Sequence, residues 1–268
     1  MSTKISLASF LAILTLGTMA NAADFAVGKG AFTSGALVIT ISGKIEKGDY
    51  VRLLKFLKPD YSKSTPEEVF KNRLAFQKTV VLDSSGGDVS EAMKIANLIE
   101  KSYANTEVPK GGRCYSSCFL IWAGGARHLL GGEIGVHRIT LAGNDTNIAK
   151  SEKVVVPASQ SVESYLLRVG IPRRIVDKMN ETSSSDLFKF DGQWLWHEDL
   201  LDAIQYRPSF IDVAQKRCGV DPTAEDVRAL RTYDKTKSRS WIGCIEGVRY
   251  ENMIGNDFLA DEIGKQLP

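Results

Sequence analysis

The run Thr79-Val80-Val81-Leu82 leads directly into a glycine pair and then into a helical pattern. A continuous β-branched run of this kind is typical of a central strand that is covered on both faces. Gly86 and Gly87 follow it, and apolar residues then recur at the spacing of one helix face: Val89, Ala92, Met93, Ala96 and Ile99. Strand, glycine turn and helix in this order make half of a βαβ unit, so the stretch predicts a layered α/β fold.

A second strand-to-helix region begins at Cys114-Tyr115-Ser116-Ser117-Cys118. The apolar run that follows, residues 119–123, ends at Gly124-Gly125 and predicts a short buried helix. Residues 127–130 and 134–137 then have the composition of two short strands. The alternation of strands and helices extends the α/β pattern along the chain.

Other elements are predicted on either side of these two regions. We expect strands at 36–41 and 106–109, helices at 50–57, 162–169 and 171–179, a strand plus a helix within 187–206, and polar surface excursions at 60–77 and 141–156. The pattern weakens after Tyr206, with a candidate helix at 224–230 and a candidate strand at 241–248. We therefore expect one α/β domain over residues 23–206 and a small C-terminal appendage over 207–268.

Residues 1–22 have the features of a secretory signal peptide. Lys4 supplies the positive charge, residues 5–19 are mostly apolar, and Ala20-Asn21-Ala22 is a small-x-small cleavage site. The mature chain is then expected to start near Ala23 and to be periplasmic or secreted. An uncleaved anchor is the alternative, but the apolar run is short for a bilayer span.

The four cysteines lie in the mature part of the chain, and an even number in an exported protein indicates disulfides. Three pairings are open. The simplest joins Cys114 to Cys118 around Ser116 and uses Cys218 with Cys244 to staple the C-terminal appendage. The spacing differs from that of paired CxxC zinc knuckles, so we expect neither a metal nor a cofactor. A formal charge of +2 over 268 residues also gives no sign of nucleic-acid binding.

Ser116 is a candidate nucleophile because acyl transfer by serine needs a hydroxyl, a base and donors for an oxyanion. The start of a helix exposes unpaired N–H groups, so the amide of Ser117 could supply one such donor. Gly87 could supply another, since glycine lets the backbone approach a ligand closely. His137, from a later predicted strand, is the candidate base.

These stretches resemble the Clp protease family, and in particular its exported relatives with a C-x-S-A-C nucleophile motif. The resemblance covers residues 36–206 and rests on the glycine turn at 83–89, the serine stretch at 114–118 with Ala123-Gly124-Gly125, and the histidine strand at 134–137. It implies a crotonase-like spiral of ββα units and a serine peptidase acting on a peptide or protein substrate. Family members usually assemble into rings or trimers, so a homo-oligomer is expected.

Carried over by residue, the resemblance makes Ser116 the nucleophile, His137 the general base, and the amides of Gly87 and Ser117 the oxyanion hole. Asp186 is the preferred third member of the triad, with Asn180 as its rival. The chain departs from the family at Ser117, where methionine or alanine is usual, and at the cysteines on either side of the serine, where small residues are usual.

Several alternatives stay open. Ser116 could be a plain helix cap, and Ser117 could be the nucleophile instead. His128 and His197 are assigned to structure. At the level of function, the rival of an exported serine hydrolase is a catalytically inactive Clp-like binding or assembly protein. A crotonase-type enzyme acting on acyl thioesters is a further class, which export disfavours because coenzyme A thioesters are cytoplasmic.

Overall fold

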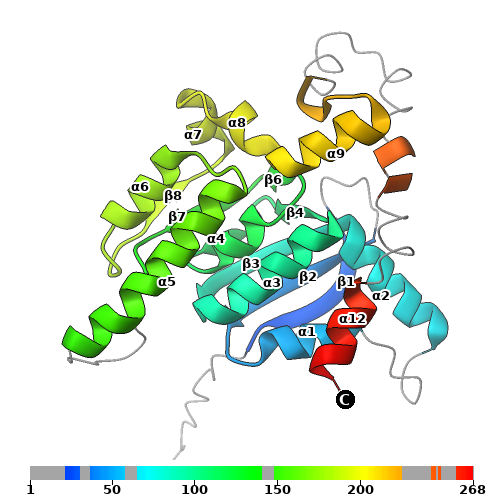
Figure 1. Ribbon diagram of the computed structural model, residues 1–268, viewed down its shortest axis with the longest axis horizontal. Coiled ribbons are helices and arrows are strands. Elements are labelled where there is room, and N and C mark those ends of the chain that lie inside the picture. The colour runs from blue at the N-terminus through cyan, green and yellow to red at the C-terminus, as the bar shows by residue number, and fades with distance from the viewer. Residues whose placement is uncertain are drawn as a thin grey trace, which may run out of the picture.

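The computed structural model describes residues 22–30, 37–57, 65–140, 148–224, 243–245, 247–248 and 258–267. Its strands form one branched sheet, and its two arms, called here the larger and the smaller sheet, meet at the long strand β3 (Thr79–Gly87) (Figure 1). The larger sheet contains β1 (Asp24–Lys29), β2 (Leu37–Ile45), which pairs with β3 as far as Gly87, β3 itself, β4 (Asn105–Val108) and β6 (His128–Leu130). The smaller one continues from Ser84 of β3 through β5 (Arg113–Tyr115), β7 (Glu133–Val136) and β8 (Phe188–Phe190).

A unit of two strands and a helix repeats along the chain. After β3 comes α3 (Val89–Ser102); β4, β5 and α4 (Cys118–Ala123) follow, and then β6, β7 and α5 (Ile148–Arg168). In each unit the first strand joins the larger sheet and the second joins the smaller one, and the strands from β2 to β7 pair in parallel. The prediction of an α/β spiral of ββα units is therefore confirmed.

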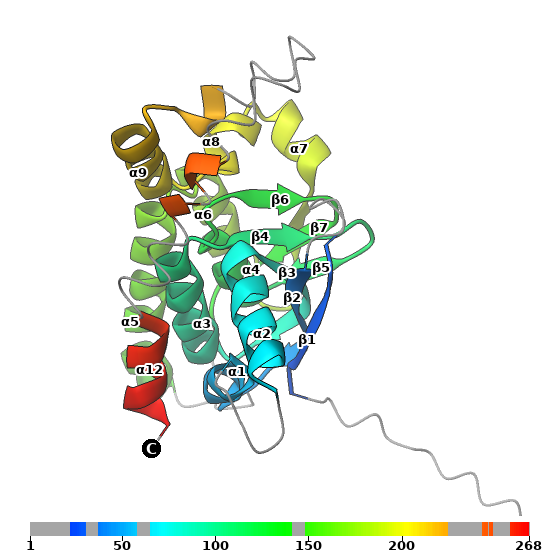
Figure 2. The ribbon, with the colours of Figure 1, turned by 90° about the vertical axis from the view of Figure 1, so that its right-hand side faces the viewer.

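The helices gather on one side of the larger sheet. Figure 2 shows α3, α5 and α12 (Phe258–Gln266) away from β1 and β2, with α1 (Asp49–Leu57) below α3. The sheet contributes buried Ile39, Ile41 and Leu82 to the core, and the predicted face of α3 contributes Ala92 and Ile99. The helical periodicity that follows the glycine turn thus corresponds to real burial.

All six residues of α4 are buried, which fixes this short helix in the middle of the core. Trp122 packs against the ring of His128, with 4.5 Å between ring centroids. The two ring nitrogens of His128 lie next to the carbonyl oxygens of Ile204 and Ala123. Burial lowers the pKa of His128 to about 4, so the ring is neutral and structural, as expected.

Two segments expected to be surface excursions are partly helical. Residues 66–78 form α2 (Pro66–Lys78), which begins with a capping box between Thr65 and Glu68 and buries Ala75 and Phe76. The helix α5 begins at Ile148, inside the stretch for which an excursion was predicted, while residues 141–147 lie outside the described ranges. The first prediction was wrong because the charged surface of α2 conceals the few apolar positions that pack. In the second stretch the helix was missed, but the surface position agrees, since Val154 and Val156 are each 49% exposed.

Of the remaining predicted helices and strands, some are observed and others are not. The two helices around Gly170 are present as the end of α5 and α6 (Arg173–Glu181), and the strand and helix expected within 187–206 are β8, α7 (Gly192–His197) and α8 (Leu201–Gln205). The three-residue strand β5 was not predicted. Residues 243–245 and 247–248 are helical, so the strand at 241–248 was wrong. The candidate helix at 224–230 lies almost wholly outside the described residues.

Buried contacts cross the boundary expected at residue 206. Arg207 is 1% exposed, and its guanidinium donates to the carbonyl oxygens of Gly124 and Glu100 at 2.9 and 3.0 Å. The helix α9 (Pro208–Cys218) packs Phe210 and Ala214 into a second apolar cluster. The division of the chain at 206 stays a prediction, but the start of the C-terminal region is packed on the α/β core.

Both disulfides follow the simplest pairing, Cys114 with Cys118 and Cys218 with Cys244. With all four cysteines bonded, no thiol is left as a zinc ligand. Disulfides of this kind agree with an oxidising, extracytoplasmic compartment. Among the helices in the described ranges, none has both the length and the apolar character that a bilayer crossing requires.

Candidate active site

Ser116 occupies the tight turn between β5 and α4, and its backbone is in the left-handed region with φ of 54°. This conformation costs a residue with a side chain about 1–2 kcal/mol, so the surrounding structure must hold it. Its N–H donates to the carbonyl oxygen of Gly135 in β7 at 2.7 Å, and its own carbonyl accepts from Phe119 at 3.0 Å. The side chain remains half-buried at the end of a strand, which is the position of a presented nucleophile.

Gly86 lies directly against this turn. Its φ is 85°, and a Cβ placed on it would come within 2.4 Å of the carbonyl oxygen of Tyr115 and 2.7 Å of the Cβ of Ser116. Gly87 has φ of 148°, and its Cβ would come within 1.9 Å of the carbonyl oxygen of Ile45. The glycine pair is therefore required both for backbone conformation and for the close approach of two backbone segments.

The glycine turn is fixed by hydrogen bonds on both sides. The hydroxyl of Ser84 donates to Gly43 at 2.5 Å and accepts from the N–H of Gly86 at 3.1 Å. The N–H of Asp88 donates to the carbonyl oxygen of Ile45 at 2.8 Å, and the Asp88 carboxylate caps α3 through the N–H of Glu91 at 2.9 Å. The turn is thus pre-organised before any ligand arrives.

The Cys114–Cys118 disulfide closes a ring around the serine turn. It joins the last buried position of β5 to the first residue of α4, and three residues, with Ser116 in the middle, lie between the two cysteines. Both cysteines are 0% exposed. The crosslink therefore restricts the strand and the helix on either side of Ser116 at the same time.

His137 follows β7 immediately, and one of its ring nitrogens is held by the backbone. Nδ1 lies 2.8 Å from the carbonyl oxygen of Arg138. Since a carbonyl only accepts, Nδ1 must carry the proton, which leaves Nε2 of the neutral ring with a free lone pair. This is the tautomer that a general base needs if Nε2 faces the nucleophile.

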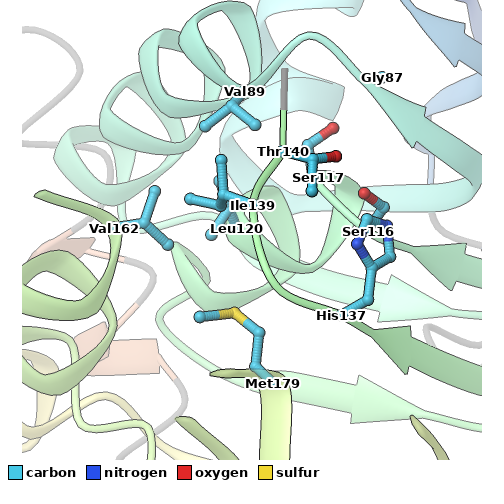
Figure 3. Close-up of a pocket in the computed structure, with 10 residues that line it drawn as sticks. All are labelled: Gly87, Val89, Ser116, Ser117, Leu120, His137, Ile139, Thr140, Val162 and Met179. Carbon is cyan, nitrogen blue, oxygen red and sulfur yellow. The ribbon is translucent and has the colours of Figure 1, made fainter. Parts of the chain in front are cut away.

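The predicted nucleophile, base and oxyanion residues meet at one cavity of about 170 Å³. Figure 3 shows the imidazole of His137 rising from the end of β7 towards the side chain of Ser116. Gly87 and Ser117 line the same cavity. Four of the five predicted site residues, separated by up to 50 positions in the sequence, are therefore brought together by the fold.

Apolar side chains form the rest of the cavity and gather to one side of the Ser116–His137 pair (Figure 3). They come from α3, α4, α5, α6 and the segment after β7: Val89, Leu120, Val162, Met179 and Ile139, with Thr140 beside them. Sequence reasoning did not assign these residues to the site. Val89, Val162 and Met179 fell within predicted helices but carried no mark of a binding role, and Ile139 and Thr140 fell within no predicted element.

A polar chain supports the serine turn from the smaller sheet. The hydroxyl of Tyr115 hydrogen-bonds Glu133, and Lys189 of β8 forms an ion pair with the same carboxylate at 3.1 Å. The Tyr115 hydrogen bond and the Lys189 ammonium lower the pKa of Glu133, so this carboxylate stays charged. Strands β5, β7 and β8 are thereby joined next to the residue that precedes Ser116.

The two candidates for a third triad member lie elsewhere. Asp186 is exposed in a turn after α6, where its N–H donates to Ser183 at 3.0 Å, and it does not line the cavity. Asn180 is exposed and donates to the carboxylate of Glu163 at 3.2 Å. The group that lies next to Nδ1 of His137 is instead the carbonyl of Arg138.

Ser117 is less suited than Ser116 to be the nucleophile. It is 3% exposed, and its buried hydroxyl has no hydrogen-bond partner among the described residues. It also makes no side-chain cap at the start of α4. Both serines line the cavity, but Ser116 is the more exposed of the two, so its hydroxyl is the better placed to attack a substrate. His197 is exposed at the end of α7 and lies outside the cavity.

No protein-family model and no curated protein matches the chain. Among solved structures, a variant of the 1510-N membrane-bound stomatin-specific protease covers 68% of this chain and 83% of its own, with 16% identity and a TM-score of 0.43. Another variant of that protease, in complex with a substrate peptide, covers 60% of this chain and 70% of its own, also with 16% identity and a TM-score of 0.43. A ClpP1 variant from Listeria monocytogenes covers 64% and 92%, with 13% identity and a TM-score of 0.43. These likenesses are distant and concern the fold.

Proposed function

We propose that this protein is an exported serine hydrolase that cleaves peptides, with Ser116 as nucleophile and His137 as general base. The observation that supports this most strongly is the convergence of both side chains, with Gly87 and Ser117, on one cavity. Attack by the Ser116 hydroxyl on a carbonyl would pass its proton to Nε2 of His137, which would then protonate the leaving amine. The amides of Gly87 and Ser117 are the proposed donors to the developing oxyanion.

In this proposal the carbonyl of Arg138 takes the orienting role for which the family resemblance made Asp186 the preferred candidate. It fixes the Nδ1–H tautomer of His137, as a carboxylate would. A neutral carbonyl stabilises an imidazolium less than a carboxylate does, so a slow enzyme is the expected outcome. Asp186 and Asn180 are not part of the proposed machinery.

The shape of the cavity indicates the substrate side chain. A space of about 170 Å³ that is lined by Val89, Val162 and Met179 accommodates an aliphatic side chain of medium size. Incubation with a mixed peptide library should therefore give cleavage next to Leu, Met, Val or Ile, with new termini identified by mass spectrometry. Cleavage next to charged residues would contradict this use of the cavity.

A peptide-binding protein without catalysis is the second candidate, and it is favoured because, among the described residues, a backbone carbonyl rather than a carboxylate lies at Nδ1 of His137. The same library distinguishes the two. Retention of aliphatic peptides, with no new termini even after long incubation, would identify a binding protein. Peptide cleavage by the wild-type protein that is lost in Ser116→Ala would identify a hydrolase.

Loss of the Cys114–Cys118 crosslink should slow catalysis without removing the substrate cavity. A displacement of a nucleophile by about 1 Å can cost roughly 10²-fold in rate, so we expect a fall of that order in kcat for C114A/C118A, with KM nearly unchanged. The variant C218A/C244A is the matched control, because it removes the remote disulfide and should keep kcat. Equal kcat in both variants, at a temperature where both are folded, would contradict a positioning role for the crosslink.

A further inference from the structure

The first described residues of the chain contact a buried carboxylate. Ala23, immediately after the predicted leader, is 0% exposed, and its N–H donates to Oδ2 of Asp49 at 3.1 Å. Ala22 is only partly buried and forms a single bridge to Lys44 of β2. The backbone therefore enters the core between Ala22 and Ala23, at the bond where the small-x-small motif predicts cleavage.

Asp49 is 0% exposed, and its two carboxylate oxygens have different partners. Oδ1 accepts from the guanidinium of Arg52 at 2.7 Å, and Arg52 itself is 46% exposed. Oδ2 accepts from the N–H of Glu46 at 2.7 Å and from that of Ala23. Oδ2 of this buried carboxylate thus accepts hydrogen bonds from neutral amides alone. A charged donor at the same position would bind Oδ2 more strongly.

We propose that Asp49 is the binding site of the mature N-terminus, an α-ammonium group created when the bond between Ala22 and Ala23 is hydrolysed. Water adds across that bond: the carbonyl carbon of Ala22 receives the hydroxyl, the nitrogen of Ala23 receives the remaining hydrogen, and the new carboxylic acid gives up its proton, so that a carboxylate and an –NH₃⁺ group result. The nitrogen already lies at hydrogen-bond distance from Oδ2, so no rearrangement is needed to form a buried ion pair. The inference rests on the predicted signal peptide.

The ion pair would be connected to the candidate active site. Glu46, whose N–H binds Asp49, follows Ile45, and the carbonyl of Ile45 accepts from Asp88 beside Gly87. A second connection runs from the N–H of Tyr50 to the carboxylate of Glu91 at 2.9 Å. Processing of the leader would therefore stabilise the start of α1 and, through it, the glycine turn that lines the cavity.

The test compares two chains that differ only in where they begin. One starts at Ala23 and the other at Asn21, each released from a fusion partner by a protease that leaves no extra residue. We expect the chain starting at Ala23 to melt about 3–6 °C higher, because only its ammonium reaches Asp49. In the D49N background this difference should vanish. In D191N, which alters a helix-capping carboxylate at α7 far from the N-terminus, the difference should persist.

Reductive methylation provides a second readout that does not depend on D49N folding. The α-amine of the chain starting at Ala23 should react at least about tenfold more slowly than that of the chain starting at Asn21, because it is buried and paired. Equal melting temperatures, equal methylation rates, or an exported protein whose first residue is not Ala23 would each overturn the proposal. None of these outcomes bears on whether Ser116 is catalytic, which is measured separately.

Discussion

Replacement of Ser116 by alanine should lower peptide hydrolysis by about 10⁴-fold or more, to the background of the assay. The substitution removes a single heavy atom, Oγ, and this is the atom that would be bonded to the substrate in the acyl intermediate. The turn should survive, because its backbone bonds to Gly135 and Phe119 do not involve the side chain. The measurement is kcat/KM on an aliphatic peptide, together with the melting temperature.

Ser117→Ala is the matched control for this result. It removes a neighbouring hydroxyl that is buried and unpaired within the described part of the chain, and it leaves the proposed backbone donor in place. Activity should therefore change by only a few-fold. If Ser117→Ala were inactive and Ser116→Ala active, the nucleophile would be Ser117 and not Ser116.

His137→Ala should reduce kcat by roughly 10²–10⁴-fold, the usual contribution of a positioned general base. Because the hydroxyl and the imidazole act as a unit, the double variant S116A/H137A should be no slower than S116A alone. His197→Ala, at an exposed position outside the cavity, should keep full activity. Additive losses in the double variant would contradict a shared proton transfer.

The variant Asp186→Asn distinguishes a dyad of Ser116 and His137 from the Ser-His-Asp triad that the family resemblance implied. The carboxylate is exposed and does not line the cavity, so we expect kcat within about twofold of the wild type. A loss comparable to that of His137→Ala would show that Asp186 reaches His137 during the reaction. It would also restore the Ser-His-Asp arrangement.

Local patterns predicted the centre of the fold well. The strand before Gly86, the helix after Gly87 and the short apolar helix after Cys118 are each encoded within about ten residues, by β-branched composition or by helical spacing. The simplest disulfide pairing was also confirmed. In these places propensity, periodicity and burial agree.

Features that depend on tertiary contacts were missed. The strand β5 has three residues, too few to show alternation, and becomes a strand only between β3 and β7. The carbonyl of Arg138 is a backbone group, so no residue type signals that it holds His137. Val162 and Met179 reach the cavity only because α5 and α6 cross it, and nothing in their local sequence indicates that role.

The most direct measurement is the site of modification by a fluorophosphonate, which reacts with activated serine hydroxyls. The wild-type protein should gain one adduct, and peptide mapping by mass spectrometry should locate it on Ser116. No adduct under conditions that label a known serine hydrolase, or an adduct at any other residue, would contradict a catalytic dyad at this cavity.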